Sequence, residues 1–236
     1  MRQVQFEIDN LTPNIDKPGI SDFLDTLNYP LYFLDFETYM TAIPPFDNTS
    51  PYMQIPFQYS LHILDKRDGT LEHREFLAKE GTDPRRPLAE KLCRDIPGGV
   101  CVITYNMTFE KRILKELADF FSDLSFHLMK VHDSMKDIMQ PFQSHAYYRR
   151  EFAGSYSIKK VLPALFPDDK KLDYSNLVLV QHGGDVMDIF PTLHEKPSEE
   201  IAKIREALLA YCRLDTFGMV KILQYLEEVT CHTYLS

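Results

Sequence analysis

Three acidic residues stand where the pattern around them calls for apolar side chains. Asp35 and Glu37 follow the apolar run 31–34 and are two residues apart, so they point to the same face of a strand. Asp215 lies within the apolar stripe of the last long helix, with Tyr211 one turn before it. Burying unpaired carboxylates is costly unless a cation compensates for the charge. The sequence therefore predicts a divalent metal site that is built from distant segments.

A fourth acid fits the same pattern in the middle of the chain. The β-prone run 100–105 is followed by Asn106 and then by an amphipathic helix, which carries Glu110 on the apolar side of its first turn. Asn106 or Thr108 is a plausible N-cap for this helix. Four acids are thus expected to meet above the ends of a sheet: Asp35, Glu37, Glu110 and Asp215.

Three motifs that contain these acids resemble those of a known enzyme superfamily. They are L-D-F-E-T at 34–38, Y-N-M-T-F-E at 105–110 and Y-C-R-L-D at 211–215. In this order they resemble the motifs of the DEDD superfamily of 3′–5′ exonucleases, which have a ribonuclease-H-like fold. The middle motif of that superfamily usually ends in Asp, whereas Glu110 keeps the charge here on a longer side chain. Tyr211 matches the tyrosine subclass, because Ala210 occupies the place of the histidine in the other subclass.

Longer stretches also resemble one bacterial family of unknown function that is placed near these exonucleases. They are Y-P-L-Y-F-L-D-F-E-T at 29–38, I-P-F-Q-Y-S-L-H at 55–62, D-P-R-R at 83–86 and G-S-Y-S-I-K-K-V-L-P-A-L at 154–165. The resemblance covers roughly residues 28–225 and implies an α/β, ribonuclease-H-like three-layer fold with a mixed, mostly five-stranded sheet flanked by helices. We expect this exonuclease domain over 29–236, preceded by a polar lead-in, 1–28, that is extended or loosely packed.

The resemblance implies a metal-dependent 3′–5′ exonuclease that hydrolyses phosphodiester bonds of DNA or RNA with two Mg²⁺ or Mn²⁺ ions. Such hard cations prefer oxygen ligands, so carboxylates suit them. By resemblance, Asp35 bridges both ions, and Glu37 and Asp215 complete the site of the ion that activates water. Glu110 acts on the second ion, and Tyr211 orients the attacking water.

The expected substrate is the single-stranded 3′ end of a nucleic acid. Phe36 or a nearby loop aromatic is suited to stack on the terminal base. Ser157 precedes Lys159 and Lys160 at a predicted helix start, where hydroxyls and lysines can hold a phosphate, although capping explains the serine equally well. The candidate substrate contacts are Phe36, Thr38, Asn106, Ser157, Lys159 and Lys160.

Composition suits a compact enzyme domain, but the net charge of −9 counts mildly against a nucleic-acid binder. We therefore expect a local basic rim, for which the candidates are Lys111, Arg112, Arg149, Arg150, Lys159 and Lys160. No apolar run is long enough for a membrane span, and the N-terminus lacks a secretory segment. The four cysteines show no paired spacing, which favours a reduced, cytoplasmic setting. The lead-in is consistent with a longer parent protein, whose further domains are candidate partners.

The coarse order of elements is three hairpin-like strands, a helix, a strand, a helix, a strand and further helices. Strands are expected at 31–37, 57–64, 72–77, 100–105 and 130–133. Helices are expected at 84–95, with Glu110 in the first turn of the next, from Ser134, from Ser155 or Ser157 through 165, and from 198 onward. The segment 168–197 has no readable periodicity.

Each assignment has a simpler rival. Asp35 and Glu37 would suit the exposed end of a strand, Glu110 favours a helix N-terminus, and Tyr211 suits a core position. Two other functions remain open. One is a catalytically weak nucleic-acid-binding module of a larger nuclease or helicase assembly. The other is a phosphohydrolase with Asp35 as covalent nucleophile, but that class has D-x-D-x-T where this chain has D-F-E-T.

Overall fold

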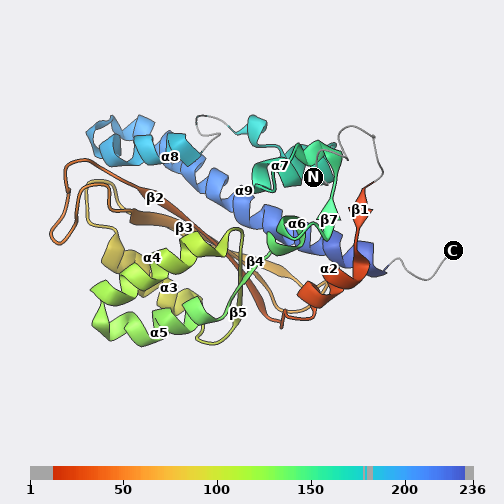
Figure 1. Cartoon of the computed structure of the whole chain (residues 1–236). Coiled ribbons are helices and arrows are strands. Elements are labelled where there is room, and N and C mark those ends of the chain that lie inside the picture. The colour runs from red at the N-terminus through yellow and green to blue at the C-terminus, as the bar shows by residue number, and fades with distance from the viewer. Residues whose placement is uncertain (1–12, 178, 180–182, 232–236) are drawn as a thin grey trace.

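A mixed five-stranded sheet forms the centre of the protein (Figure 1). The computed structural model describes residues 13–177, 179 and 183–231. The sheet has the order β4-β3-β2-β5-β6. Its strands are β2 (Leu31–Tyr39), β3 (Ile55–Leu64), β4 (Leu71–Leu77), β5 (Cys101–Thr104) and β6 (Met135–Asp137). The first three pair antiparallel, as the predicted hairpins require, and β5 and β6 run parallel to β2.

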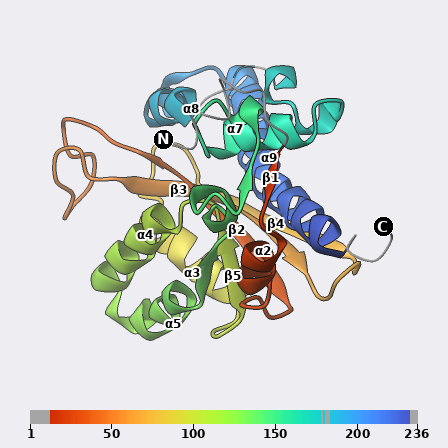
Figure 2. The same cartoon turned by 45° about the vertical axis from the view of Figure 1, so that its right-hand side comes forward.

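Helices cover both faces of this sheet, because successive side chains of the central strand point to opposite sides. Leu31 and Phe33 of β2 join one hydrophobic cluster, and Tyr32 and Leu34 join another. The first cluster includes the long helix α9 (Ser198–Cys231), and the second includes α3 (Arg85–Asp95), α4 (Met107–Phe120) and α5 (Ser122–Asp133). Figure 2 shows α9 on one side of the sheet and α3 to α5 on the other. The predicted three-layer α/β architecture is thus confirmed.

Smaller elements surround α9. They are β1 (Asn14–Ile15), α2 (Lys17–Leu24), α6 (Gln140–Gln143), β7 (Tyr147–Tyr148), η1 (Arg150–Phe152), α7 (Ile158–Leu165), η2 (Lys170–Leu172), η3 (Tyr174–Asn176), α8 (Gly183–Ile189) and η4 (Phe190–Glu195). In its described residues, the segment 168–197, which has no sequence periodicity, contains short 3₁₀ helices and one short α-helix. No helix in the described part of the chain is both long and apolar enough to cross a membrane.

The expectation of an extended, loosely packed lead-in is wrong for residues 14–24. Strand β1 pairs with β7, and α2 buries Ile20 and Phe23 in the same hydrophobic cluster as α9. Helix α2 is so short that its apolar spacing does not stand out in the sequence. Asp16 caps this helix by accepting a hydrogen bond from the backbone N–H of Gly19. Residues 1–12 of the predicted lead-in lie outside the described part.

The expected fifth strand at 130–133, with a helix from Ser134, is also wrong. Helix α5 continues to Asp133, because Leu128 and Val131 lie one helical turn apart and are both buried against the sheet. The strand follows as β6, which has only three residues and therefore no alternation that the sequence could display. The strand thus ends at Asp137 and not at Asp133, the last residue of the expected strand.

A buried polar network joins the sheet to α9. His62 Nδ1 lies 2.8 Å from the Thr216 hydroxyl, which lies 2.8 Å from the hydroxyl of Ser60, and Ser60 contacts His73 at 2.9 Å. Burial, together with the charges of the nearby His73 and Arg213, lowers the pKa of His62 from 6.5 to about 3. His62 is therefore neutral in the folded protein at neutral and mildly acidic pH.

This burial predicts an acid-sensitive contribution to stability. Between about pH 6.5 and pH 3 the unfolded state holds a proton on His62 that the folded state lacks, so stability falls as the pH falls through this window. From pH 7 to pH 5 the wild type should lose on the order of 1–2 kcal/mol more than His62→Gln. Urea unfolding at the two pH values measures this, with the exposed His194→Gln as control. An equal pH dependence in wild type and His62→Gln would refute the assignment.

Candidate metal centre

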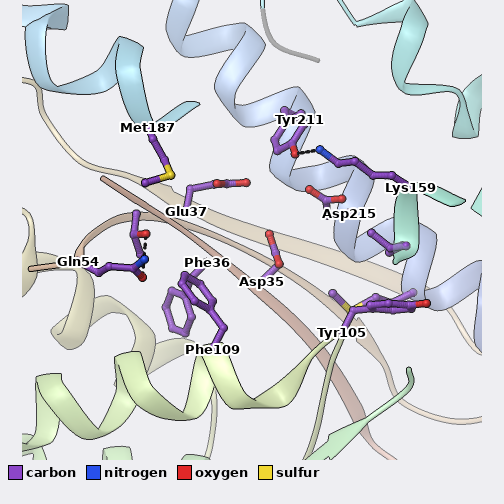
Figure 3. Close-up of a pocket in the computed structure, with 13 residues that line it drawn as sticks. Asp35, Phe36, Glu37, Gln54, Tyr105, Phe109, Lys159, Met187, Tyr211 and Asp215 are labelled. Carbon is purple, nitrogen blue, oxygen red and sulfur yellow. Dashed lines mark hydrogen bonds between the residues drawn. The ribbon is translucent and has the colours of Figure 1, made fainter. Parts of the chain in front are cut away.

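Four of the predicted catalytic residues meet near the carboxyl ends of the parallel strands. Strands β2, β5 and β6 are parallel, so their carboxyl ends lie together, and α9 crosses the sheet above them. Asp35 and Glu37 of β2 and Tyr211 and Asp215 of α9 line one cavity of about 280 Å³. Figure 3 shows these four side chains around the same space. The two ends of the chain therefore supply one site.

The pairing of β2 with β3 is irregular beside the acids, with the extra residue, Phe57, on β3. The register with β3 shifts between Glu37 and Thr38: Glu37 lies opposite Gln58, whereas Thr38 lies opposite Pro56. A bulge bends a strand and increases its local twist, and bulges are frequent next to active sites. Pro56 fits this place because it has no backbone N–H to contribute to a regular ladder. The ladder is thus irregular where the acids of β2 face the cavity.

The carboxylates strongly affect one another's protonation. Burial and the charge of Asp215 raise the pKa of Asp35 well above its usual range, and burial and Asp35 do the same for Glu37. Burial raises the pKa of Asp215 to about 6, although Tyr174 and Lys159 act in the opposite direction. Among the described residues that line the cavity, Lys159 is the only lysine or arginine. The site therefore holds more negative charge than its own cations balance.

Glu110 is the most deeply buried of the four acids, with 2% of its surface exposed. Burial, together with the charge of Asp35, raises the pKa of its carboxyl group well above the usual range. Its Oε2 atom is buried and has no hydrogen-bond partner among the described residues. Such an oxygen needs a ligand, because an unsatisfied buried polar atom is destabilising. Carboxylate oxygens, one of them unpartnered, are ligands that fit Mg²⁺ or Mn²⁺.

The position of Glu110 is set by the N-terminal cap of α4, which is neither of the two residues expected from the sequence. Asn106 precedes α4 with a left-handed backbone, φ 73°, but its side chain makes no capping hydrogen bond, and Thr108 lies inside the helix. Instead, the carboxylate of Asp137 accepts hydrogen bonds from the backbone N–H groups of Asn106 and Met107, both at 3.0 Å. The end of β6 therefore holds the start of α4, and with it Glu110.

Tyr211 and Lys159 form a pair at the rim of the acid cluster. The Lys159 ammonium, from the first turn of α7, donates a hydrogen bond to the Tyr211 hydroxyl and lies 4.7 Å from the centre of its ring. Burial and the nearby carboxylates raise the pKa of Tyr211 far above its usual value. The hydroxyl is therefore protonated, and because it accepts from Lys159 its own proton is available to another acceptor.

Two further residues belong to the site and were not predicted. Tyr174 donates a hydrogen bond to Asp215 Oδ1 at 2.5 Å, and Cys212 Sγ lies 3.5 Å from Asp35 Oδ2. Tyr174 comes from a segment without periodicity, so no sequence signal marked it. Cys212 did carry a signal, because it lies three residues before Asp215 and so shares its helix face.

The predicted substrate contacts separate into two groups. Lys159, Thr38 and Phe36 line the cavity, but Phe36 is only 3% exposed and its ring packs edge-on against Tyr59. The half-buried ring of Phe109 also lines the cavity and is more accessible to a base.

The remaining predicted contacts lie outside this cavity. Asn106 and Ser157 line a neighbouring cavity of about 610 Å³, which shares Tyr105 with the first. Ser157 precedes α7 without forming a side-chain cap, and Lys160 is exposed and lines neither cavity. Asp35, Glu37, Asp215 and Tyr211 are thus brought together around one cavity, and Glu110 is buried outside its lining but interacts electrostatically with Asp35. The substrate contacts are only partly brought together.

Comparisons with known proteins identify uncharacterised relatives. The chain is 26% identical over 216 residues to "Uncharacterized protein MG366 homolog" of Mycoplasma pneumoniae, covering 83% of this chain and 32% of the relative. It is 26% identical over 233 residues to "Uncharacterized protein UU173" of Ureaplasma parvum, covering 88% and 33%. The chain thus spans about a third of the length of these relatives. No solved structure matches significantly. Residues 32–157 match the family model "Domain of unknown function (DUF2779)", and the chain belongs to this family.

Proposed function

We propose that this domain is a metal-dependent 3′–5′ exonuclease that hydrolyses phosphodiester bonds of DNA or RNA. The observation that carries the proposal is that Asp35, Glu37 and Asp215, from two motifs far apart in the chain, line one cavity, and that Glu110, from the third motif, interacts electrostatically with Asp35 and Glu37. One of these acids, Glu110, has a buried oxygen without a partner among the described residues. The order and spacing of the motifs, which resemble those of DEDD exonucleases, support the same function.

Asp35, Glu37, Glu110 and Asp215 would hold two Mg²⁺ or Mn²⁺ ions. When bound, such ions lower the pKa of a water molecule and stabilise the charge that develops on the leaving oxygen. The protein supplies the carboxylates at fixed positions: Tyr174 holds Asp215 by a hydrogen bond at 2.5 Å, and the Asp137 cap fixes the helix that carries Glu110. Oriented charges of this kind act strongly in a site with little water.

Other side chains of the cavity suit the substrate. The Tyr211 hydroxyl, fixed by Lys159, is placed to donate to the attacking water or to a phosphate oxygen. The Phe109 ring is available to stack on a terminal base, and Arg112 lies with its guanidinium 5.5 Å from the centre of that ring. Arg112 and Lys159 thus provide the local positive charge with which an overall acidic protein can bind the phosphates of a nucleic acid.

Cleavage of labelled single strands tests this function. We expect 5′-labelled single-stranded DNA or RNA to give, in Mg²⁺ or Mn²⁺, a ladder that shortens from the 3′ end, and no ladder in chelator. The same strand with a blocked 3′ end serves as control and should be degraded more slowly. Binding of the strands without any metal-dependent cleavage would instead indicate a nucleic-acid-binding module and would reject the exonuclease.

Metal binding should also stabilise the fold in a pH-dependent way. In chelator, the folded protein holds a proton on Asp215 up to about pH 6, whereas the unfolded chain loses it near 3.8, so stability falls as the pH rises through this window. A divalent cation displaces that proton, and its stabilising effect should therefore grow with pH. We expect the difference in Tm between Mg²⁺ and chelator to be larger at pH 7.5 than at pH 5. A difference that is the same at both pH values would contradict this linkage.

A further inference from the structure

A thiol lies inside the acid cluster. Cys212 is fully buried, and its Sγ lies 3.5 Å from Asp35 Oδ2 and 3.7 Å from the Asp35 carbonyl oxygen. One potential ligand atom each from Asp35, Glu37 and Cys212 lies within 4.8 Å of the others. In the described part of the chain, this is the group of metal-ligating side chains with the closest spacing. The tightest donor set is therefore two carboxylates and one sulfur, not carboxylates alone.

The separation of sulfur and oxygen matches a tetrahedral thiophilic ion. Zinc binds thiolate sulfur at about 2.3 Å and carboxylate oxygen at about 2.1 Å, which in a tetrahedron places the two atoms about 3.6 Å apart. The observed distance from Cys212 Sγ to Asp35 Oδ2 is 3.5 Å. An ion could therefore be bound by both atoms with little movement of either side chain.

A second observation comes from the fourth acid, Glu110, which lies outside this three-residue group. Glu110 is 2% exposed, interacts electrostatically with Asp35, and has a buried oxygen without a hydrogen-bond partner among the described residues. Its carboxylate belongs to a different segment from Cys212, so the two observations are independent. Together they describe a negatively charged site that contains both hard and soft donors.

We propose that Asp35, Glu37 and Cys212 form a mixed thiolate–carboxylate site for Zn²⁺ or Cd²⁺, which competes with Mg²⁺ for the same centre. As the metal–sulfur bond forms, the S–H bond breaks and its proton passes to solvent. Soft thiolate donors select such ions over Mg²⁺, which requires oxygen ligands. The competition with Mg²⁺ rests on the proposed function, whereas the binding of Cd²⁺ or Zn²⁺ does not. Under this proposal, trace zinc inhibits the nuclease.

Cadmium titration provides the test, because a Cd²⁺–thiolate bond has its own ultraviolet charge-transfer absorption. The wild type should show this band saturating at one ion per chain, and Cys212→Ser should lose it and bind Cd²⁺ at least about tenfold more weakly. Cys231→Ser is the matched control, since Cys231 lies on the same helix but is exposed. Circular dichroism and Tm in chelator verify that each variant is folded.

The outcomes separate this proposal from the proposed function. A band that persists in Cys212→Ser, or that is absent from the wild type, overturns the thiolate site even where Mg²⁺-dependent cleavage is observed. A Cys212-dependent band without any cleavage supports the thiolate site and rejects the nuclease. Where both hold, added Mg²⁺ should shift the Cd²⁺ titration to higher concentrations, and the absence of any shift would place the two ions at different sites and overturn the competition.

Discussion

Asp35→Asn should lower metal-dependent cleavage about a thousandfold, the upper end of the effect of removing one group that stabilises a transition state. Asp35 lies at the centre of the acid cluster: its charge raises the pKa of both Glu37 and Glu110. The amide has nearly the same shape but cannot neutralise a divalent cation. The steady-state rate of release of the terminal nucleotide, at saturating Mg²⁺, measures the change.

The same substitution should stabilise the protein in chelator. Without a cation, Asp35 adds charge to a buried cluster that already repels itself, and functional sites of this kind are frequently maintained at the expense of stability. Removal of that charge should raise Tm by roughly 2–4 °C, the change that about 1 kcal/mol produces in a domain of this size. In Mg²⁺ the order should reverse, because the wild type alone gains the full stabilisation by the ion.

The matched control is Asp133→Asn, which makes the same chemical change at an exposed residue outside the cavity. It should alter neither cleavage nor the difference in Tm between Mg²⁺ and chelator. An Asp35→Asn protein that is well folded and cleaves at the wild-type rate would reject the assignment of Asp35. A variant that loses activity together with stability in chelator would indicate a structural role instead.

Tyr211→Phe should lower kcat about a hundredfold with a smaller change in KM, because its hydroxyl acts on the reacting water or phosphate and contributes little to binding of the rest of the strand. The substitution also leaves the Lys159 ammonium without the oxygen to which it donates. Lys159→Met should therefore also lower kcat. Because the two residues are in contact, the double variant should lose no more activity than the sum of the two single effects predicts. Single-turnover kinetics with an excess of enzyme isolate the chemical step.

Tyr225→Phe is the control for this comparison. Tyr225 lies on the same helix, and its hydroxyl pairs with that of Tyr147 at 2.6 Å, outside the cavity. Loss of this hydroxyl should affect stability but not kcat. If Tyr211→Phe behaved like Tyr225→Phe in both measurements, Tyr211 would be a core residue and the tyrosine-subclass resemblance would carry no mechanistic meaning.

Elements with strong periodicity were predictable from the sequence. The alternation of β2 placed Asp35 and Glu37 on one face, and the three- and four-residue steps of α9 placed Tyr211 and Asp215 on another. In each case an acid interrupts a long apolar pattern, so both the element and the exceptional residue were visible. The central strands, α9 and the acids of the site follow from these patterns.

Parts of the site that depend on tertiary packing were not predictable. Tyr174 reaches Asp215 from a 3₁₀ turn that has no repeat, and Asp137 caps α4 from a strand of only three residues. Neither contact leaves a local signature, because its partner lies far away in the sequence. Phe36 shows the converse: its motif suggested a substrate contact, but alternation along β2 turns its ring into the opposite core.

The most direct test of the metal centre is to count the metal ions that the purified protein binds. Electron paramagnetic resonance of free Mn²⁺ during a titration measures the number bound and their affinities. We expect saturable binding of about two ions per chain. We also expect weaker binding in Asp35→Asn and in Glu110→Gln, with nuclease activity that rises in parallel with occupancy. Absence of saturable binding by folded wild-type protein, or binding that neither substitution changes, would contradict the metal centre.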